Sequence, residues 1–239
     1  MAPEILRIRN LTFSYDGGRP ILNGLNLELG EGEILSVMGR SGSGKTTLLK
    51  LIAGLLYPYD GEITLKILKN RLGYVPQQIG LVSNLTALQN VLLGSLGRPG
   101  GYGRILGIFP EEEVEKAYKL LNELGISELA DRKAALLSGG ERQRVAVGRA
   151  LMQEPQLLLA DEFVSDLDVF NAMEVMKITR DLCRRKNVSV IMTMHDAFLV
   201  KGFSDRVAVI GNGRVIRDFP ASQLDTESLS KLLVGDAVV

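Results

Sequence analysis

A glycine-rich motif in the first quarter of the chain places a lysine and a threonine at the spacing that binds phosphate groups. Residues 39–46 have the sequence G-R-S-G-S-G-K-T, which matches G-x-x-x-x-G-K-[ST]. Glycines let backbone N–H groups converge on phosphate oxygens, and a following helix adds the positive end of its dipole. The Lys45 ammonium is expected to reach the β- and γ-phosphates, and the Thr46 hydroxyl to take one position on Mg²⁺. The motif predicts a site for a nucleoside triphosphate.

Patterns on both sides of this motif predict the elements that hold it. The apolar run Ile34–Met38 is typical of a buried strand, and residues 47–53 have the composition of a helix. A strand, a glycine-rich turn and a helix in succession are the context that a phosphate-binding loop requires. The predicted phosphate-binding residues are Gly39, Arg40, Ser41, Gly42, Ser43, Gly44, Lys45, Thr46 and Thr47.

A second constellation combines another glycine-rich turn with two carboxylates. Residues 137–144, L-S-G-G-E-R-Q-R, open a predicted helix whose serine hydroxyl and glycine N–H groups form an anion-binding concavity. Residues 157–162, L-L-L-A-D-E, predict a buried strand that ends in two acids. Asp161 is placed to hold Mg²⁺ through water, and Glu162 to polarise an attacking water. The two motifs together predict phosphoryl transfer to water.

Two kinds of strand pattern predict an α/β fold with two sheets. Alternating apolar residues predict antiparallel strands at Ile5–Asn10, Leu25–Leu29 and Glu62–Ile67. Short, fully apolar runs predict buried parallel strands at Leu157–Ala160 and Val188–Met192. A helical segment precedes each of these two runs, at residues 141–153 and 169–186, which favours a parallel sheet covered on both faces.

The stretch from about residue 85 to about residue 136 departs from this alternation. It contains two amphipathic helix candidates, Ala87–Leu96 and Glu111–Leu124, separated by a glycine-rich loop at residues 97–103. We expect residues 1–239 to form a single domain in which a helical subdomain at about 85–136 is inserted in the nucleotide-binding core. Further on, G-N-G at residues 211–213 predicts a hairpin, and the last twenty residues predict a short surface helix.

Composition narrows the class of protein. The 28 Lys and Arg residues balance 28 Asp and Glu residues, so no general electrostatic footprint for nucleic acid is present. A single cysteine, Cys183, leaves no intrachain disulfide, which fits a reducing cytoplasm. No run approaches 18 consecutive apolar residues, and the first residues lack the pattern of a secretory signal. We therefore expect a cytoplasmic protein that reaches a membrane only by docking on another subunit.

With these motifs the chain resembles the nucleotide-binding subunits of ABC transporters. The resemblance covers roughly residues 5–220, and its most specific element is the L-S-G-G-E signature at residues 137–141. It implies the ABC ATPase fold: a P-loop NTPase core with a parallel sheet, an antiparallel β subdomain and an inserted helical subdomain. It also implies that the chain binds ATP with Mg²⁺ and hydrolyses the ATP to power transport.

The resemblance also implies roles for single residues. Tyr15 corresponds to the aromatic residue that stacks on adenine, Gln77 to the glutamine that senses Mg²⁺ and the attacking water, and His195 to the histidine that contacts the γ-phosphate. The implied catalytic residues are Glu162, His195, Gln77 and Lys45, and the implied metal-binding residues are Thr46, Gln77 and Asp161. Beyond the phosphate loop, the implied nucleotide-binding residues are Tyr15, Ser138, Gly139, Gly140 and Asp168.

Two positions depart from the family pattern. Phe163 follows the proposed catalytic glutamate where the family usually has proline, and Asp166 replaces the usual alanine in the S-D-L-D segment at residues 165–168. An extra carboxylate near a subunit interface is expected to weaken the closed dimer or to require a local cation.

The implied partners are a second copy of the chain, docked head to tail, and integral membrane permease subunits. The chain is expected to lie on the cytoplasmic face of the membrane, and no nucleic-acid partner is expected. Residues 81–86, 90–97 and 106–111 have a local likeness to phosphonate importer ATPases, which suggests phosphonate or a related oxyanion as cargo. A soluble ABC ATPase of iron–sulfur cluster assembly, or of another non-transport process, is the alternative. The chain lacks the long heptad insertion of DNA-repair relatives, the second core of translation factors and the Asn-Lys-x-Asp guanine reader of GTPases.

Overall fold

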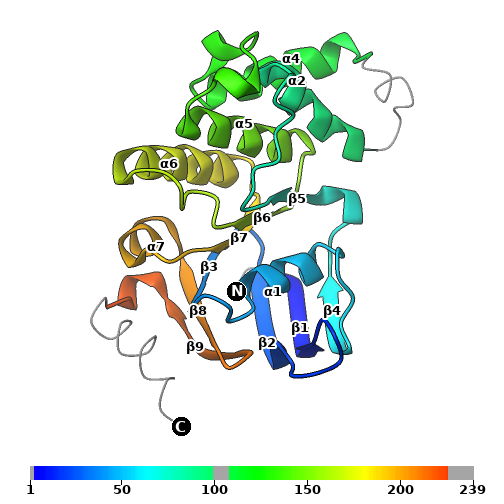
Figure 1. The fold of residues 1–239 in the computed structure, drawn as a ribbon, viewed down its shortest axis with the longest axis vertical. Coiled ribbons are helices and arrows are strands. Elements are labelled where there is room, and N and C mark those ends of the chain that lie inside the picture. The colour runs from blue at the N-terminus through cyan, green and yellow to red at the C-terminus, as the bar shows by residue number, and fades with distance from the viewer. Residues whose placement is uncertain (1–2, 99–107, 226–239) are drawn as a thin grey trace.

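The computed structural model describes residues 3–98 and 108–225, and these form two sheets with helices packed against them. Part of the loop predicted at residues 97–103 and the helix predicted in the last twenty residues lie outside the described residues. Figure 1 shows the helices α2, α4 and α5 gathered at one end of the long axis and the smaller sheet toward the other end. No helix in the described ranges is long and apolar enough to cross a membrane.

The smaller sheet is antiparallel and has three strands in the order β2-β1-β4. Buried and exposed residues largely alternate in its strand of residues 22–30, because successive side chains of a strand point to opposite faces. The predicted strands are confirmed here, with longer bounds at the start of the chain. The strands are β1 (Glu4–Phe13), β2 (Leu22–Gly30) and β4 (Asp60–Leu65).

The larger sheet has six strands in the order β5-β6-β7-β3-β8-β9. All neighbouring pairs are parallel except the β8–β9 hairpin, which the G-N-G turn predicts. Strand β5 was not predicted, because its four residues carry no clear pattern. The strands are β3 (Ile34–Gly39), β5 (Leu72–Val75), β6 (Leu157–Asp161), β7 (Ser189–Thr193), β8 (Arg206–Gly211) and β9 (Arg214–Pro220).

Six α-helices and five short 3₁₀ helices surround the sheets in the described ranges. Side chains cap several of them: Ser138 and Glu141 form a capping box on α5, and Asp196 accepts two backbone N–H bonds at α7. The α-helices are α1 (Lys45–Ile52), α2 (Ala87–Leu92), α4 (Glu111–Glu123), α5 (Gly139–Met152), α6 (Val169–Arg185) and α7 (Ala197–Phe203). The 3₁₀ helices are η1 (Lys69–Arg71), η2 (Leu93–Gly97), η3 (Ser127–Leu129), η4 (Ala134–Leu136) and η5 (Ala221–Gln223).

The segment between β5 and α5 returns close to its starting point. The Ala134 N–H donates to the Leu85 carbonyl at 2.9 Å, and the Ala87 N–H donates to the Arg132 carbonyl at 2.9 Å. Helix α2 therefore begins beside the end of the same segment. The first predicted helix, Ala87–Leu96, is α-helical only to Leu92 and continues as the 3₁₀ helix η2. The second begins after Pro110, as predicted, with three glutamates in its first turn.

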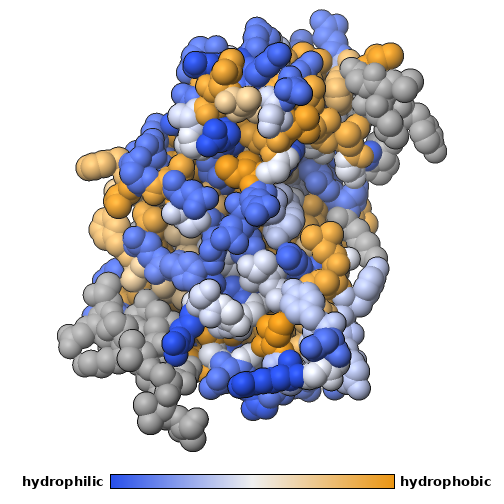
Figure 2. Space-filling view, viewed as in Figure 1, coloured by the Kyte–Doolittle hydropathy of each residue, from blue (hydrophilic) through white to orange (hydrophobic). Residues whose placement is uncertain are grey.

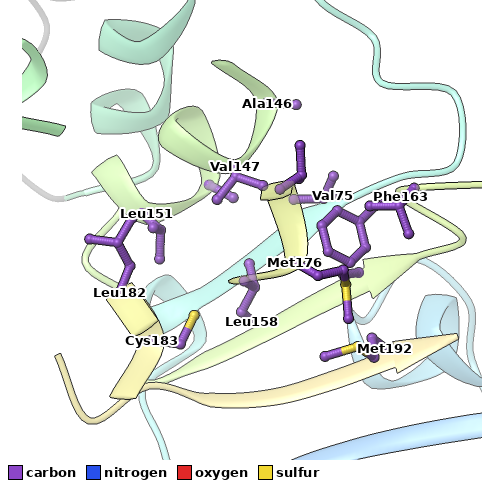
Figure 3. Packing of buried hydrophobic residues seen from close by; sticks show 14 of the residues in the cluster. Val75, Ala146, Val147, Leu151, Leu158, Phe163, Met176, Leu182, Cys183 and Met192 are labelled. Carbon is purple, nitrogen blue, oxygen red and sulfur yellow. The ribbon is translucent and has the colours of Figure 1, made fainter. Parts of the chain in front are cut away.

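The larger sheet separates two hydrophobic cores. Alternate residues of β6 belong to different cores, because Leu158 faces α5 and α6 while Leu157 and Leu159 face α1 and the smaller sheet. Figure 3 shows the first core, where Val147 and Leu151 lie against Leu158 and Cys183. Figure 2 shows that polar side chains cover most of one face of the molecule, with smaller hydrophobic patches between them. Burial on both faces explains the nearly unbroken apolar sequences of β3, β6 and β7.

Candidate nucleotide-binding site

The first glycine-rich motif forms the turn between β3 and α1. Gly44 is the N-cap of α1 with φ +99°, and a Cβ atom built there would lie 2.7 Å from Leu22 Cδ2. Glycine is therefore required at this position both by the backbone conformation and by the contact. The first N–H groups of α1 have no partner within the helix, so they are available to an anion at this end.

Lys45 spans the turn from inside the protein. Its side chain is 4% exposed, and Nζ donates to the Gly39 carbonyl at 3.0 Å and to the Arg40 carbonyl at 3.1 Å. Burial lowers the pKa of Lys45, while the nearby carboxylates of Glu162 and Asp161 oppose that shift. A buried ammonium held against two carbonyl groups gains most from an incoming anion, because its own charge is incompletely compensated.

Thr46 and Asp161 bring two oxygen ligands together at the end of β6. Thr46 Oγ1 donates to Asp161 Oδ1 at 3.1 Å, and Asp161 is 1% exposed. A hydroxyl beside a carboxylate is the kind of oxygen set that Mg²⁺ accepts when phosphates and water complete its shell. No group of three or more His, Cys, Asp or Glu side chains that could hold a metal occurs among the described residues. The Thr46 hydroxyl and the Asp161 carboxylate fit a Mg²⁺ ion that a nucleotide brings with it.

The Ser43 hydroxyl in the phosphate loop is a candidate contact for a phosphate oxygen. Its Oγ is buried and has no hydrogen-bond partner in the part of the chain that the structure describes. A buried hydroxyl without a partner costs free energy, so an incoming phosphate oxygen would remove that cost.

The Glu162 carboxylate lies close to the other three candidate catalytic residues. Gln77 Nε2 donates to Glu162 Oε2 at 3.1 Å, while His195 Nε2 lies 2.5 Å and Lys45 Nζ 3.9 Å from Glu162 Oε1. The structure therefore brings together all four residues that the sequence analysis assigned to catalysis. Glu162 also has φ +43°, a left-handed conformation that costs a non-glycine residue about 1–3 kcal/mol. Strain of this size at a carboxylate inside a cavity is a mark of a functional position.

Arg149 of α5 fixes the segment that carries Gln77, and sequence reasoning missed it. Its guanidinium donates to the Ile79 carbonyl at 2.6 Å and to the Gly80 carbonyl at 2.7 Å. Burial lowers the pKa of this arginine. An arginine on a predicted helix gives no sequence signal of this contact.

One cavity is lined by both the phosphate loop and Glu162. Its volume is about 260 Å³, and Ile21 contributes an apolar wall that no motif identified. A neighbouring cavity of about 650 Å³ is lined by residues 40–43 of the loop, but by neither Lys45 nor Glu162. The chemistry is therefore placed in the smaller cavity, which is lined by Ile21, Ser41, Gly42, Gly44, Lys45, Thr46, Thr47, Gln77 and Glu162.

Tyr15 lies beside the phosphate loop and is 58% exposed. Its hydroxyl lies 3.2 Å from Thr47 Oγ1, and its ring meets Phe13 edge to face at a centroid distance of 4.9 Å. A ring held at its hydroxyl end and open on one side can receive a planar base.

The second glycine-rich turn does not contribute to this cavity. Ser138 accepts the Glu141 N–H at the start of α5, and a Cβ built at Gly139 would lie 3.1 Å from Leu167 Cδ2. Asp168 caps α6, where its carboxylate accepts the Asn171 N–H at 3.1 Å. Ser138, Gly139, Gly140 and Asp168 thus lie together on a separate surface of the same chain.

The two departures from the family pattern have different structural outcomes. Phe163 is 3% exposed, and Figure 3 shows its ring beside the Met176 side chain in the core. The apolar contacts of this residue explain why an aromatic side chain is accommodated there. Asp166 instead lines a cavity of about 600 Å³ together with Gln77 and Arg142.

Comparisons with known proteins agree with this geometry. The model of a family described as ABC transporter matches residues 22–165. A protein of Treponema denticola named phosphonates import ATP-binding protein PhnC is 35% identical over 240 residues, which cover 95% of this chain and 94% of that protein. A nucleotide-free ATP-binding cassette from an ABC transporter superposes with a TM-score of 0.86 at 27% identity, over 99% of both chains. A dimeric ATP-binding cassette in a post-hydrolysis state with ADP and Pi superposes with a TM-score of 0.78 at 30% identity, over 92% of this chain and all of that one.

Proposed function

The chain belongs to the ABC transporter family as an ATP-binding subunit and ATPase, and we propose that two copies of it hydrolyse Mg²⁺-ATP at a shared interface to drive import of phosphonate or a related oxyanion through separate membrane subunits. The observation that carries this proposal is the position of Glu162. Its carboxylate lies in the cavity of the phosphate loop, within hydrogen-bond distance of Gln77 and His195.

In the proposed mechanism the chain supplies position and charge rather than covalent chemistry. Lys45 binds the β- and γ-phosphates, and Tyr15 receives the adenine. Glu162 accepts the proton of the attacking water, and Gln77 and His195 hold its carboxylate in place. Thr46, Asp161 and Gln77 would hold Mg²⁺, which when bound would supply positive charge against the phosphates.

The proposed interface follows from the separation of the two glycine-rich turns. Ser138, Gly139 and Gly140 carry the anion-binding chemistry of a helix N-terminus, yet they do not line the cavity of Lys45 and Glu162. A second copy docked head to tail supplies them to the nucleotide. ATP then joins two surfaces. Hydrolysis breaks the bond between ADP and the γ-phosphate, and release of that phosphate removes negative charge from the interface, so the dimer opens. The dimeric cassette with ADP and Pi, 30% identical to this chain, supports this arrangement.

The membrane partners and the cargo are proposed from the relatives. The protein of T. denticola that is named as a phosphonate import subunit matches 95% of this chain, which supports an importer of the same class. The membrane subunits form the pathway, and this chain docks on their cytoplasmic side. We propose residues 85–136, with α2 and α4, as a helical subdomain of this assembly.

The experiment that tests the proposal is sedimentation of Glu162→Gln with and without Mg²⁺-ATP. The variant should bind ATP, hydrolyse it about 10²–10⁴-fold more slowly and shift from monomer to dimer only with nucleotide. A double variant that also carries Lys45→Ala is the control, because it should bind the nucleotide roughly 10–100-fold more weakly and stay monomeric at the ATP concentration that dimerises Glu162→Gln. Full turnover by Glu162→Gln would contradict the assignment of the base. A variant that binds ATP and remains monomeric at every protein concentration would contradict the shared interface.

The cargo is tested separately by growth of a bacterium on a phosphonate. A strain that lacks the ATPase of its own phosphonate importer, and that expresses this chain with its membrane partners, should grow with methylphosphonate as the sole phosphorus source. The same strain with Lys45→Ala should not grow on methylphosphonate and should grow normally on phosphate. Growth on methylphosphonate that does not depend on Lys45 would contradict the cargo.

A further inference from the structure

Thr193 ends β7 directly beside the two acids at the end of β6. In the parallel register Asp161 is paired with Thr193, and the threonine side chain is fully buried. The pairing places one hydroxyl group next to both carboxylate-bearing residues.

That hydroxyl makes two hydrogen bonds at once. Thr193 Oγ1 donates to Asp161 Oδ1 at 2.7 Å and accepts the Glu162 N–H at 2.8 Å. A hydroxyl has one donor and two acceptor positions, so the two bonds do not compete. One bond orients the Asp161 carboxylate, and the other holds the Glu162 backbone in its left-handed conformation.

We propose that Thr193 is a positioning residue for ATP hydrolysis, because its buried hydroxyl ties the metal-binding side chain of Asp161 to the backbone of the catalytic base Glu162. This inference rests on the proposed function, since it requires Glu162 to be the base. Asp161 Oδ1 also accepts a bond from Thr46 Oγ1 at 3.1 Å. When Thr46 binds the ion instead, the Thr193 bond still keeps Asp161 oriented.

Packing alone does not explain the threonine, because a valine would fill the same volume without either bond. Thr179 of α6 offers the contrast within the same chain. It is 4% exposed, and its Oγ1 has no hydrogen-bond partner among the described residues. Valine at position 179 removes a hydroxyl that makes no hydrogen bond with the described residues. Valine at position 193 instead leaves the Glu162 N–H without its partner and removes one of the two donors, Thr193 and Thr46, of Asp161 Oδ1.

The first test compares steady-state ATP hydrolysis by Thr193→Val, Thr193→Ser and the matched control Thr179→Val. Thr193→Val should lower kcat by about 10–100-fold, as is usual for residues that orient a metal ligand. Its KM for ATP should change by less than about threefold, because the phosphate loop is intact. Thr193→Ser keeps the hydroxyl and should restore kcat to near the wild-type value, and Thr179→Val should not change it. If Thr193→Val does not fold, Thr193→Ala removes the hydroxyl without adding an atom and replaces it in the comparison.

The second test asks whether Thr193 acts through Glu162. Thr193→Val is introduced into the Glu162→Gln background, and binding of a fluorescent ATP analogue with Mg²⁺ is measured alongside turnover. We expect a smaller loss of kcat in that background than in the wild type, because only the contribution through Asp161 remains, and we expect unchanged nucleotide affinity. An equal loss in both backgrounds would indicate a general structural role and contradict the inference, as would a wild-type kcat for Thr193→Val. Full turnover by Glu162→Gln alone would instead contradict the proposed function.

Discussion

His195, the single histidine of the chain, forms a hydrogen bond with Glu162: its Nε2 lies 2.5 Å from Glu162 Oε1. The two residues follow different strands, β7 and β6, that lie side by side in the larger sheet. Because the carboxyl ends of parallel strands meet at one edge, the histidine reaches a carboxylate that is 33 positions away in the sequence. This contact places the imidazole where it can orient the base.

The contact predicts that His195→Ala lowers kcat more than it weakens nucleotide binding. We expect a decrease in kcat of about 10–100-fold, since the side chain orients a catalytic group and does not build the phosphate loop. His195→Gln can still donate a hydrogen bond to Glu162, so it should keep more activity than the alanine variant. The measurement is single-turnover hydrolysis together with calorimetric ATP binding. An alanine variant as active as the wild type would contradict this role.

Lys45→Ala should weaken ATP binding rather than change the fold. A hydrogen bond that involves a charged group contributes about 1.5–3 kcal/mol, so we expect affinity to fall by roughly 10–100-fold. The matched control is Lys50→Ala, which removes a lysine from the last turn of the same helix, away from the cavity. Equilibrium binding of a fluorescent ATP analogue measures both. Equal losses for the two variants would show that Lys45 has no special contact with the phosphates.

Arg149→Met should destabilise the protein through the segment after Gln77. The change leaves the Ile79 and Gly80 carbonyl groups without their donor, which we expect to cost about 1–3 kcal/mol in the free energy of unfolding. Arg185→Met, at an exposed position at the end of α6, should stay within about 0.5 kcal/mol of the wild type. Urea unfolding measures both variants. A difference of less than about 0.5 kcal/mol between the two variants would mean that water replaces the guanidinium at no cost in the free energy of unfolding.

Cys183 predicts how stability depends on alkaline pH. Burial raises the pKa of its thiol from 9.0 to about 12. Below pH 9 the thiol is protonated in both the folded and the unfolded state, so it does not change the free energy of unfolding. Between pH 9 and about 12 only the unfolded thiol ionises, so the free energy of unfolding falls as pH rises, by up to about 1.4 kcal/mol for each pH unit.

Urea unfolding of the wild type and Cys183→Ala between pH 8 and pH 11 tests this dependence. The wild type should lose stability more steeply with pH than the variant, whatever their difference at pH 8. Tyr74, whose pKa burial and the charge of Asp161 raise to about 12, is present in both proteins and cancels in the comparison. Parallel pH profiles would show that the thiol ionises equally in the two states.

Much of the fold and of the candidate site could be predicted from the sequence. The phosphate loop, the signature turn and the strand ending in Asp161 and Glu162 are local patterns, because each needs a fixed order of residues within one turn or strand. The strands from Ile34 and Leu157, and the helix that starts after Pro110, are likewise set by local burial and capping. The spacing of apolar residues, every second position in a strand or every three to four in a helix, shows which face of a segment is buried. This spacing can be read from each segment alone.

The contacts between these segments were decided only by the tertiary structure. The order β5-β6-β7-β3 places β7 between the strand of the phosphate loop and the strand of the acids, so that Thr193 and His195 both reach Glu162. The Arg149 bonds to Ile79 and Gly80 depend in the same way on packing between distant elements. Local patterns fix which residues can do the chemistry, whereas hydrogen bonds across 30 or more positions exist only once non-local strands are paired and their side chains are buried together.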